Sequence, residues 1–168
     1  MSLLSKIGLG LKNIYNKTLN KLSALKGTPQ SIAKGFATGA AMSFTPFVGF
    51  HLVLSLLVAK LTKQNGVAAA LGTIVGNPWT FPFIWYLTLH TGHFMLGSEA
   101  PKLPVNFKTL FSELYHALIK LDFNAFINDI WPIYYPMLIG CIPFYIGVWW
   151  ALSYLIKQVL TQSSNNGG

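Results

Sequence analysis

Two apolar stretches, 35–61 and 67–96, set the pattern of the chain, and both carry proline and glycine near the middle. His51 is the only ionisable residue of the first stretch before its final turn. This stretch is longer than the roughly 20 residues that a helix needs to cross a hydrocarbon core about 30 Å thick. Pro46, however, has no N–H for the carbonyl of Met42, and its ring crowds that carbonyl. We therefore predict two short half-helices around a break.

The second stretch repeats this construction. Pro78 cannot bond the Ile74 carbonyl, and Pro82 cannot bond the Pro78 carbonyl. In both stretches a pair of glycines precedes a Pro-Phe pair at nearly the same spacing, and a third Pro-Phe pair begins at Pro143. The glycines are Gly35, Gly39, Gly72 and Gly76. Paired interrupted segments indicate a repeat-built membrane core with its site at the breaks, although small residues and prolines are also common in membrane helices in general.

The last apolar run, 131–156, carries no charge and is the simplest predicted transmembrane span. Pro132, Pro136 and Pro143 predict an irregular first half. Tryptophan and tyrosine side chains near both ends are typical of interfacial aromatic belts. The fold class expected is therefore an all-α membrane protein, with two proline-broken segments, re-entrant or kinked, and one C-terminal transmembrane helix.

Two amphipathic helices are expected beside this core. Residues 4–25 place apolar residues every three or four positions, with lysines off that stripe, so a basic helix should lie in the headgroup interface. Its lysines are Lys6, Lys12, Lys17, Lys21 and Lys26. A second helix over 107–121 is too short and too charged to span. The predicted organisation is an interfacial helix over 1–28, one helical membrane domain over 29–160 and a disordered tail over 161–168, with Thr28 as an N-cap and Pro29 at the first helical position.

Topology depends on the polar loop between the two broken stretches. Lys60 and Lys63 would lie outside if the first stretch crossed completely, against the positive-inside rule. Both lysines stay inside if each stretch is a hairpin that turns near its prolines. Re-entrant backbone needs protein or water over its freed polar groups. The sequence favours hairpins without deciding against full crossings.

Composition supports the membrane assignment and narrows the partners. The 168 residues are 52% hydrophobic and 10% charged, and mean hydropathy is +0.48, whereas about a quarter of the residues of a soluble domain are charged. All twelve basic residues are lysine, so the arginine fork favoured for nucleic acid is missing. We expect the lipid bilayer and anionic headgroups as partners, with a second copy or another membrane protein, at a bacterial inner membrane with a cytoplasmic N-terminus.

Candidate site residues gather at the breaks. Because no acidic residue precedes Glu99, the histidines are the titratable groups of this region, and a polar group at membrane depth is a functional candidate. Asn77 and Thr80 could join a ligand site, or they could cap the half-helices that they interrupt. The glycines are expected to pack helices closely. The candidate ligand or pore residues are Pro46, Gly49, His51, Asn77, Pro78, Thr80, Pro82 and His90.

No catalytic or metal motif accompanies them. The chain has no nucleophile and base pairing, phosphate-cradling glycine loop or cofactor fingerprint, so we expect no enzyme activity, no cofactor and no metal. His90 and His93 lack a defined third metal ligand.

The two broken stretches resemble a bacterial integral-membrane family known only as a domain of unknown function, number 2062. The sequence is most similar to the alphaproteobacterial members of that family. The resemblance covers residues 27–155, and Asn77-Pro78-Trp79-Thr80 with Pro82 is its most specific part. Further matching positions are Gly35-Phe36-Ala37, Gly39, Pro46-Phe47, Gly49-Phe50-His51, Asn65, Gly72-Thr73 and Gly97. Because members carry glutamine or histidine at the position of His51, the resemblance implies a hydrogen-bonding position there. It implies membrane residence and no particular activity.

Two functions remain open from the sequence. The first is a transport-like or permeation-like core for a small solute or lipid, suggested by the matched interruptions. The second is a non-catalytic scaffold or accessory subunit that binds another membrane protein or anionic lipid through its basic helix.

Overall fold

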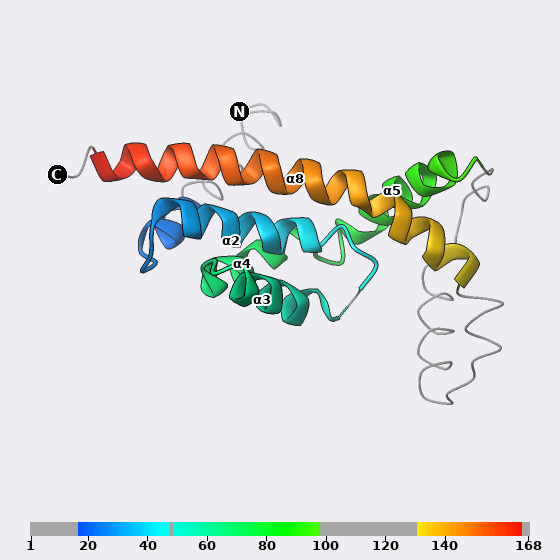
Figure 1. The fold of residues 1–168 in the computed structure, drawn as a ribbon, viewed down its shortest axis with the longest axis horizontal. Helices are drawn as coiled ribbons and strands as arrows, with labels where there is room; N and C mark the ends of the chain where they lie inside the picture. The colour runs from blue at the N-terminus through cyan, green and yellow to red at the C-terminus, as the bar shows by residue number, and fades with distance from the viewer. Residues whose placement is uncertain (1–16, 48, 98–130, 166–168) are drawn as a thin grey trace, which may run out of the picture.

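The computed structural model describes residues 17–47, 49–97 and 131–165, which form helices joined by turns without any strand (Figure 1). The all-α class is therefore confirmed. Residues 17–23 are helical and belong to the predicted basic helix. The first part of that helix, with Lys6 and Lys12, and the predicted helix over 107–121 lie outside the described residues.

Helix α2, Pro29–Met42, begins as the sequence predicts. Thr28 is its N-cap in extended conformation, and the Thr28 hydroxyl accepts a hydrogen bond from the Ser31 N–H at 3.2 Å. Pro29 occupies the first turn, where its missing N–H removes no helical hydrogen bond. The helix is buried on most sides by small residues, including Ala33, Ala37 and Ala40.

The break at Pro46 is confirmed. After Met42 the chain tightens into bonds of the i to i+3 type, in which Ser43 and Thr45 donate to Ala40 and Met42 at 3.2 and 3.1 Å. Gly49 then adopts a φ of +84°, a conformation that glycine takes at no steric cost. Helix α3, His51–Leu61, runs back along α2 (Figure 1). The first broken stretch is therefore a helical hairpin.

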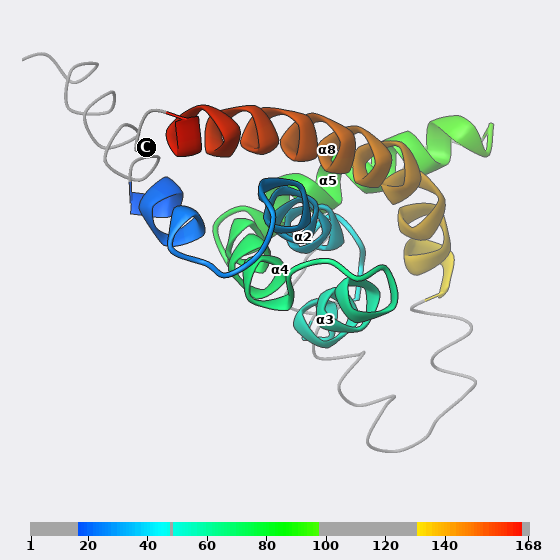
Figure 2. The ribbon, with the colours of Figure 1, turned by 60° about the vertical axis from the view of Figure 1, so that its left-hand side comes forward.

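The second broken stretch has a different form. It consists of α4 (Gly66–Gly72), the 3₁₀ turn η1 (Thr73–Val75) and α5 (Phe81–Met95). Gly76 is extended, which separates η1 from α5. Helix α5 does not fold back on α4 but packs against α8 (Trp131–Asn165) (Figures 1 and 2). The sequence favoured hairpins without deciding against full crossings, and the second stretch does not form a hairpin in the structure.

Helix α8 is continuous through Pro136 and Pro143. The third Pro-Phe pair therefore lies within an unbroken 35-residue helix, which packs on α2 and α5. Both views show α8 curving over the other helices (Figures 1 and 2), as proline is expected to bend a helix. It continues to Asn165, so the tail predicted from 161 is helical in its first part.

Glycine sets two helix contacts where backbones almost touch. A Cβ added to Gly39 would collide with the Ala69 carbonyl oxygen, and one added to Gly72 would collide with the Phe36 carbonyl oxygen. Helices α2 and α4 therefore cross at backbone distance. A Cβ on Gly92 would likewise meet the Pro136 carbonyl oxygen, which fixes α5 against α8. Close backbone contacts thus join α2 to α4 and α5 to α8.

Among the described residues, many large apolar side chains are exposed on the outside of the protein, whereas small residues are buried between the helices. On α3 the buried residues are Ser55 and Ala59, whereas Phe50 just before it is 64% exposed and Val53 is 61% exposed. Similar exposed side chains follow α5 and α8, including Phe83, Phe94, Ile142, Ile146 and Trp150. Close packing of small residues with an apolar exterior is the arrangement expected in lipid.

The lysines of the described residues gather at one end, which we call the base and define as residues 17–34, 60–66 and 157–165. Asn65 joins its parts, because its N–H donates to the Ser31 carbonyl at 3.2 Å and its side-chain amide donates to the Lys26 carbonyl at 2.9 Å. Leu160 packs with Leu22 and Ile32 there. All lysines of the described ranges belong to the base: Lys17, Lys21, Lys26, Lys34, Lys60, Lys63 and Lys157.

Candidate functional site at the helix breaks

The two breaks lie side by side at the opposite end of the α2–α3 hairpin, which we call the tip (residues 43–47, 49–50 and 76–80). The Ser43 hydroxyl reaches the carbonyl oxygens of Gly39 at 3.3 Å and Thr73 at 3.5 Å. A Cβ on Gly76 would touch the Ser43 side chain. The His51 ring stands edge-on to Phe81, with ring centroids 5.8 Å apart. The structure thus brings the two breaks into one region.

Groups of the protein donate hydrogen bonds to carbonyl oxygens that the first break leaves without a helical partner. The Met42 carbonyl accepts hydrogen bonds from the N–H and the hydroxyl of Thr45, at 3.1 and 2.7 Å. The buried Pro46 carries a carbonyl that accepts the Tyr134 hydroxyl at 2.6 Å. Both donors were missed by sequence reasoning. Thr45 had a local signal, since it lies three residues after Met42, whereas Tyr134 lies 88 positions from Pro46.

Asn77 and Thr80 cap each other. The Asn77 side-chain oxygen accepts the N–H groups of Trp79 and Thr80 at 3.0 and 3.2 Å, and the Thr80 hydroxyl accepts the Asn77 N–H at 3.0 Å. This reciprocal pattern resembles a capping box and lies in the turn just before α5, whose N-cap is Thr80. The Thr80 hydroxyl also donates to the Val75 carbonyl at 2.7 Å. The geometry therefore favours the capping interpretation of these residues over the ligand interpretation.

The prolines and Gly49 act on the backbone. Pro78 follows the capping Asn77, and Pro82 lies in the first turn of α5, where its N–H would have no helical partner in any case. Pro82 therefore begins a helix and does not interrupt one. Gly49 is exposed, and a Cβ there would meet no atom within 4 Å. The turn of the hairpin depends on the positive φ of Gly49.

The predicted histidines separate into two places. His51 begins α3 at the tip, and its buried Nδ1 has no hydrogen-bond partner among the described residues. His90 lies on α5, with Nδ1 3.0 Å from the Tyr86 carbonyl oxygen and its ring centroid 4.1 Å from that of Tyr86. At about 1.5 Å per residue, His90 is roughly 14 Å along the helix from Phe81. His90 is therefore not part of the tip.

A polar chain near the base was not anticipated. The Thr38 hydroxyl, which is fully buried, donates to the Gln64 side-chain oxygen at 2.6 Å and accepts the Trp149 indole N–H at 3.0 Å. It connects α2, the loop after α3, and α8. Such satisfied networks fix the arrangement of helices in an apolar interior.

The described residues bear on metal binding and on membrane crossing. Within them, no three side chains of the His, Cys, Asp or Glu types lie close enough to hold a metal ion. In the same part of the chain, one helix segment, 131–162, is long and apolar enough to cross a membrane. Association with a membrane is therefore indicated by a single span.

Comparison with protein families gives a match that covers nearly the whole chain. Residues 12–166 match the family described as "Uncharacterized protein conserved in bacteria (DUF2062)". The chain belongs to this family. The predicted resemblance is thus confirmed, while its alphaproteobacterial leaning stays a prediction. Comparisons of this DUF2062 protein with curated proteins and with solved structures find no match.

Proposed function

We propose that this protein is a non-catalytic membrane scaffold of the bacterial inner membrane, with its base at the cytoplasmic headgroups and its tip inside the hydrocarbon. The carrying observation is the separation of charge: every lysine of the described ranges lies in the base, and the tip carries none. Lysine clusters favour the cytoplasmic, anionic leaflet. In this orientation α8 crosses the membrane, and the α2–α3 hairpin enters the bilayer from the cytoplasmic side.

The dimensions of the hairpin agree with a half crossing. Helix α2 has 14 residues and α3 has 11, which correspond to about 21 and 16 Å at 1.5 Å per residue. Both are shorter than a hydrocarbon core of about 30 Å. The proposed hairpin therefore enters the bilayer and returns without crossing it.

The second broken stretch has the dimensions of a full crossing. Helix α4 starts in the base, η1 reaches the tip, and α5 continues beyond it along α8. The 15 residues of α5 add about 22 Å to the roughly 17 Å of α4 and η1. In this topology Lys63 stays cytoplasmic and Leu96 faces the opposite side.

The scaffold function is supported over transport by the state of the tip. Ligand sites of broken-helix transporters use unwound backbone carbonyls that are open to a substrate. Here the carbonyls of Met42 and Pro46 accept hydrogen bonds from Thr45 and Tyr134. Asn77 and Thr80 likewise bond to each other. A tip closed in this way serves to hold helices in place.

Single-cysteine labelling tests the orientation. In a Cys141→Ser background, Lys63→Cys, Phe50→Cys and Leu96→Cys place one thiol at the base, the tip and the end of α5. A membrane-impermeant maleimide should label Lys63→Cys in inside-out vesicles and Leu96→Cys in right-side-out vesicles. Phe50→Cys should react only after detergent is added. Labelling of Phe50→Cys from the outer face, as fast as that of Leu96→Cys, would refute the half crossing.

One observation favours a second candidate, the transport-like core. The Nδ1 atom of His51 is buried at the junction of both breaks without a hydrogen-bond partner in the described structure, and a polar group at membrane depth can take part in an ion path. Proton entry into liposomes with a trapped pH-sensitive dye tests this. The candidate requires faster entry with the wild type than with His51→Ala. Entry equal to that of protein-free vesicles would remove it.

A further inference from the structure

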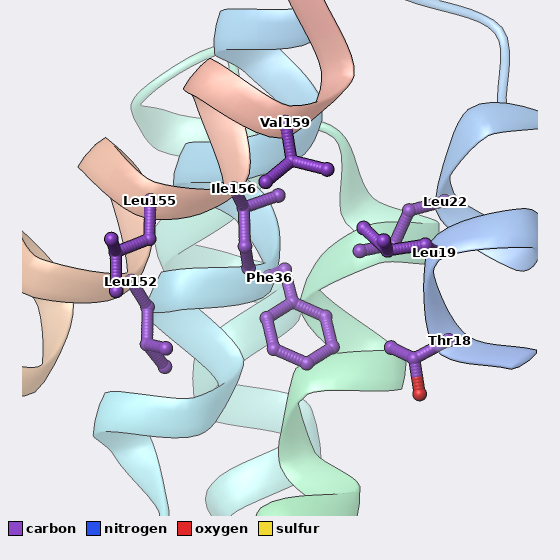
Figure 3. Close-up of a pocket in the computed structure, with 8 residues that line it drawn as sticks. All are labelled: Thr18, Leu19, Leu22, Phe36, Leu152, Leu155, Ile156 and Val159. Atoms are coloured by element: carbon purple, nitrogen blue, oxygen red, sulfur yellow. The ribbon is translucent and has the colours of Figure 1, made fainter. Parts of the chain in front are cut away.

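A cavity of about 270 Å³ lies in the base between the helix over 17–23, α2 and the C-terminal part of α8 (Figure 3). Leu19, Phe36, Ile156 and Val159 line it from these three elements, and Thr18 is the one lining residue with a polar side chain. Figure 3 shows the hydrocarbon side chains facing one another across the space.

The cavity leads from the exterior into the molecule. Leu155, which lines it, is 55% exposed, whereas Leu22, which also lines it, is 1% exposed. A dry cavity of about 150 Å³ lined by aliphatic side chains holds a benzene ring. By that measure this one has room for a hydrocarbon chain of about ten carbon atoms. The walls offer no hydrogen-bond partners for a polar solute beyond Thr18, so a hydrocarbon tail fits and a polar molecule does not.

Three lysines are close in sequence to residues that line this cavity. Lys17 and Lys21 flank Thr18 on the helix over 17–23, and Lys157 follows Ile156 on α8; all three are exposed. The four acidic residues of the chain all fall between 99 and 129, outside the described ranges. In the part of the chain that the structure describes, these lysines therefore have no carboxylate side chain as counter-ion.

We propose that the cavity binds one acyl chain of an anionic phospholipid whose phosphate is held by Lys17, Lys21 and Lys157. The phosphate supplies the missing negative charge, and the lysine stems reach past the apolar wall to the headgroup level. The inference rests on the proposed function, because it needs the base to lie at the headgroups of the bilayer. It adds a specific lipid to that function.

Electron paramagnetic resonance of spin-labelled lipid tests the site. The full-length protein is placed in phosphatidylcholine liposomes with phosphatidylglycerol or phosphatidylcholine that carries a nitroxide on its acyl chain. An immobilised component is expected, larger for phosphatidylglycerol. Val159→Phe fills the cavity and should abolish this excess. Ile146→Phe introduces the same side chain at an exposed position of α8, 61% exposed and away from the cavity, and should leave it unchanged.

The charge is tested in the same way. Lys21→Gln should lower the preference for phosphatidylglycerol about fivefold, the factor expected for one lysine beside anionic headgroups. Lys63→Gln, in the base but on the loop after α3, is the matched control and should have a smaller effect. Equal immobilisation of both lipids, or an equal effect of both substitutions, would overturn the headgroup assignment and with it the proposal.

Further variants distinguish loss of lipid from the cavity from a loss of folding. Leu19→Phe fills the cavity from the opposite wall and must reproduce the loss seen with Val159→Phe, with unchanged helical circular dichroism. A larger immobilised component after removal of residues 1–16 would make the N-terminal segment the native occupant and would overturn the proposal. So would an unchanged excess in both phenylalanine variants. Cysteine labelling of the tip is independent of these outcomes, so failure of the lipid site is distinguishable from failure of the topology.

Discussion

The glycine contact between α2 and α4 gives the sharpest test of the fold. Gly39→Ala adds one methyl group where the Ala69 carbonyl oxygen already stands, with the Thr73 nitrogen also within 3 Å of the new atom. Both neighbours are backbone, so neither can move aside by a rotamer change. The two helices must separate. We expect Gly39→Ala to destabilise the protein.

The magnitude follows from a matched variant. Gly147 lies on α8, and a Cβ added there meets no atom within 4 Å. Alanine is favoured over glycine in a helix by up to about 1 kcal/mol, and this gain applies to both variants. Overpacking costs about 1–3 kcal/mol, and backbone contact on two sides places Gly39→Ala at the upper end. The free energies of unfolding of the two variants should therefore differ by about 3 kcal/mol. Gly147→Ala should be stabilised by about 1 kcal/mol, and Gly39→Ala should be destabilised by about 2 kcal/mol.

Unfolding in mixed micelles measures this difference. Sodium dodecyl sulfate is added to protein in a mild detergent, and helix content is followed by circular dichroism. A destabilisation of about 2 kcal/mol raises the unfolded-to-folded ratio roughly 30-fold at a fixed detergent composition. Equal shifts in the same direction for both variants would show that α2 and α4 do not approach as described.

Three further predictions concern hydrogen bonds that sequence reasoning did not resolve. Trp149→Phe removes the donor to Thr38 and should destabilise by about 1 kcal/mol, measured in the same micelle titration; an equal loss in Trp150→Phe, whose side chain is exposed, would contradict it. Tyr134→Phe leaves the carbonyl at the tip unpaired and should cost about 1–3 kcal/mol, with faster amide exchange of residues 43–47 by mass spectrometry as the specific readout. Asn77→Ala removes a cap and should cost about 0.5–2 kcal/mol, whereas the uncharged Asn77→Ser keeps a side-chain acceptor and should restore most of the stability; failure of this rescue in thermal unfolding would argue against a capping role.

Local rules accounted for the helix boundaries that were predicted correctly. Thr28 with Pro29 forms an N-cap, and Pro46 ends a helical stretch, because both effects depend on a few neighbouring backbone groups. The sequence predicted 131–156 as one span with an irregular first half, and α8 is a continuous helix through Pro136 and Pro143 that packs on other helices. Tertiary contacts decide such cases, and one sequence does not contain them explicitly.

The candidate site shows the same limit. Asn77 and Thr80 were recognised as either ligands or caps, and only coordinates show that each bonds to the other. His90 was grouped with the tip because both broken stretches carry a histidine beyond their prolines. The rise along α5 places His90 roughly 14 Å from Phe81 and therefore away from the tip. The hydrogen bond from Tyr134 to the tip was not predicted, since Pro46 is far from it in sequence.

The half-length hairpin also gives the described structure a taper. Helices α2, α3, α4 and the C-terminal half of α8 share the level between base and tip, whereas α5 and the N-terminal half of α8 continue beyond it (Figures 1 and 2). In the proposed orientation, with the base in the cytoplasmic leaflet, helices α2, α3, α4 and the C-terminal half of α8 would displace more lipid area from that leaflet than α5 and the N-terminal half of α8 would from the other. Such a wedge responds to membrane curvature, so the protein should concentrate where the cytoplasmic leaflet is the more expanded one.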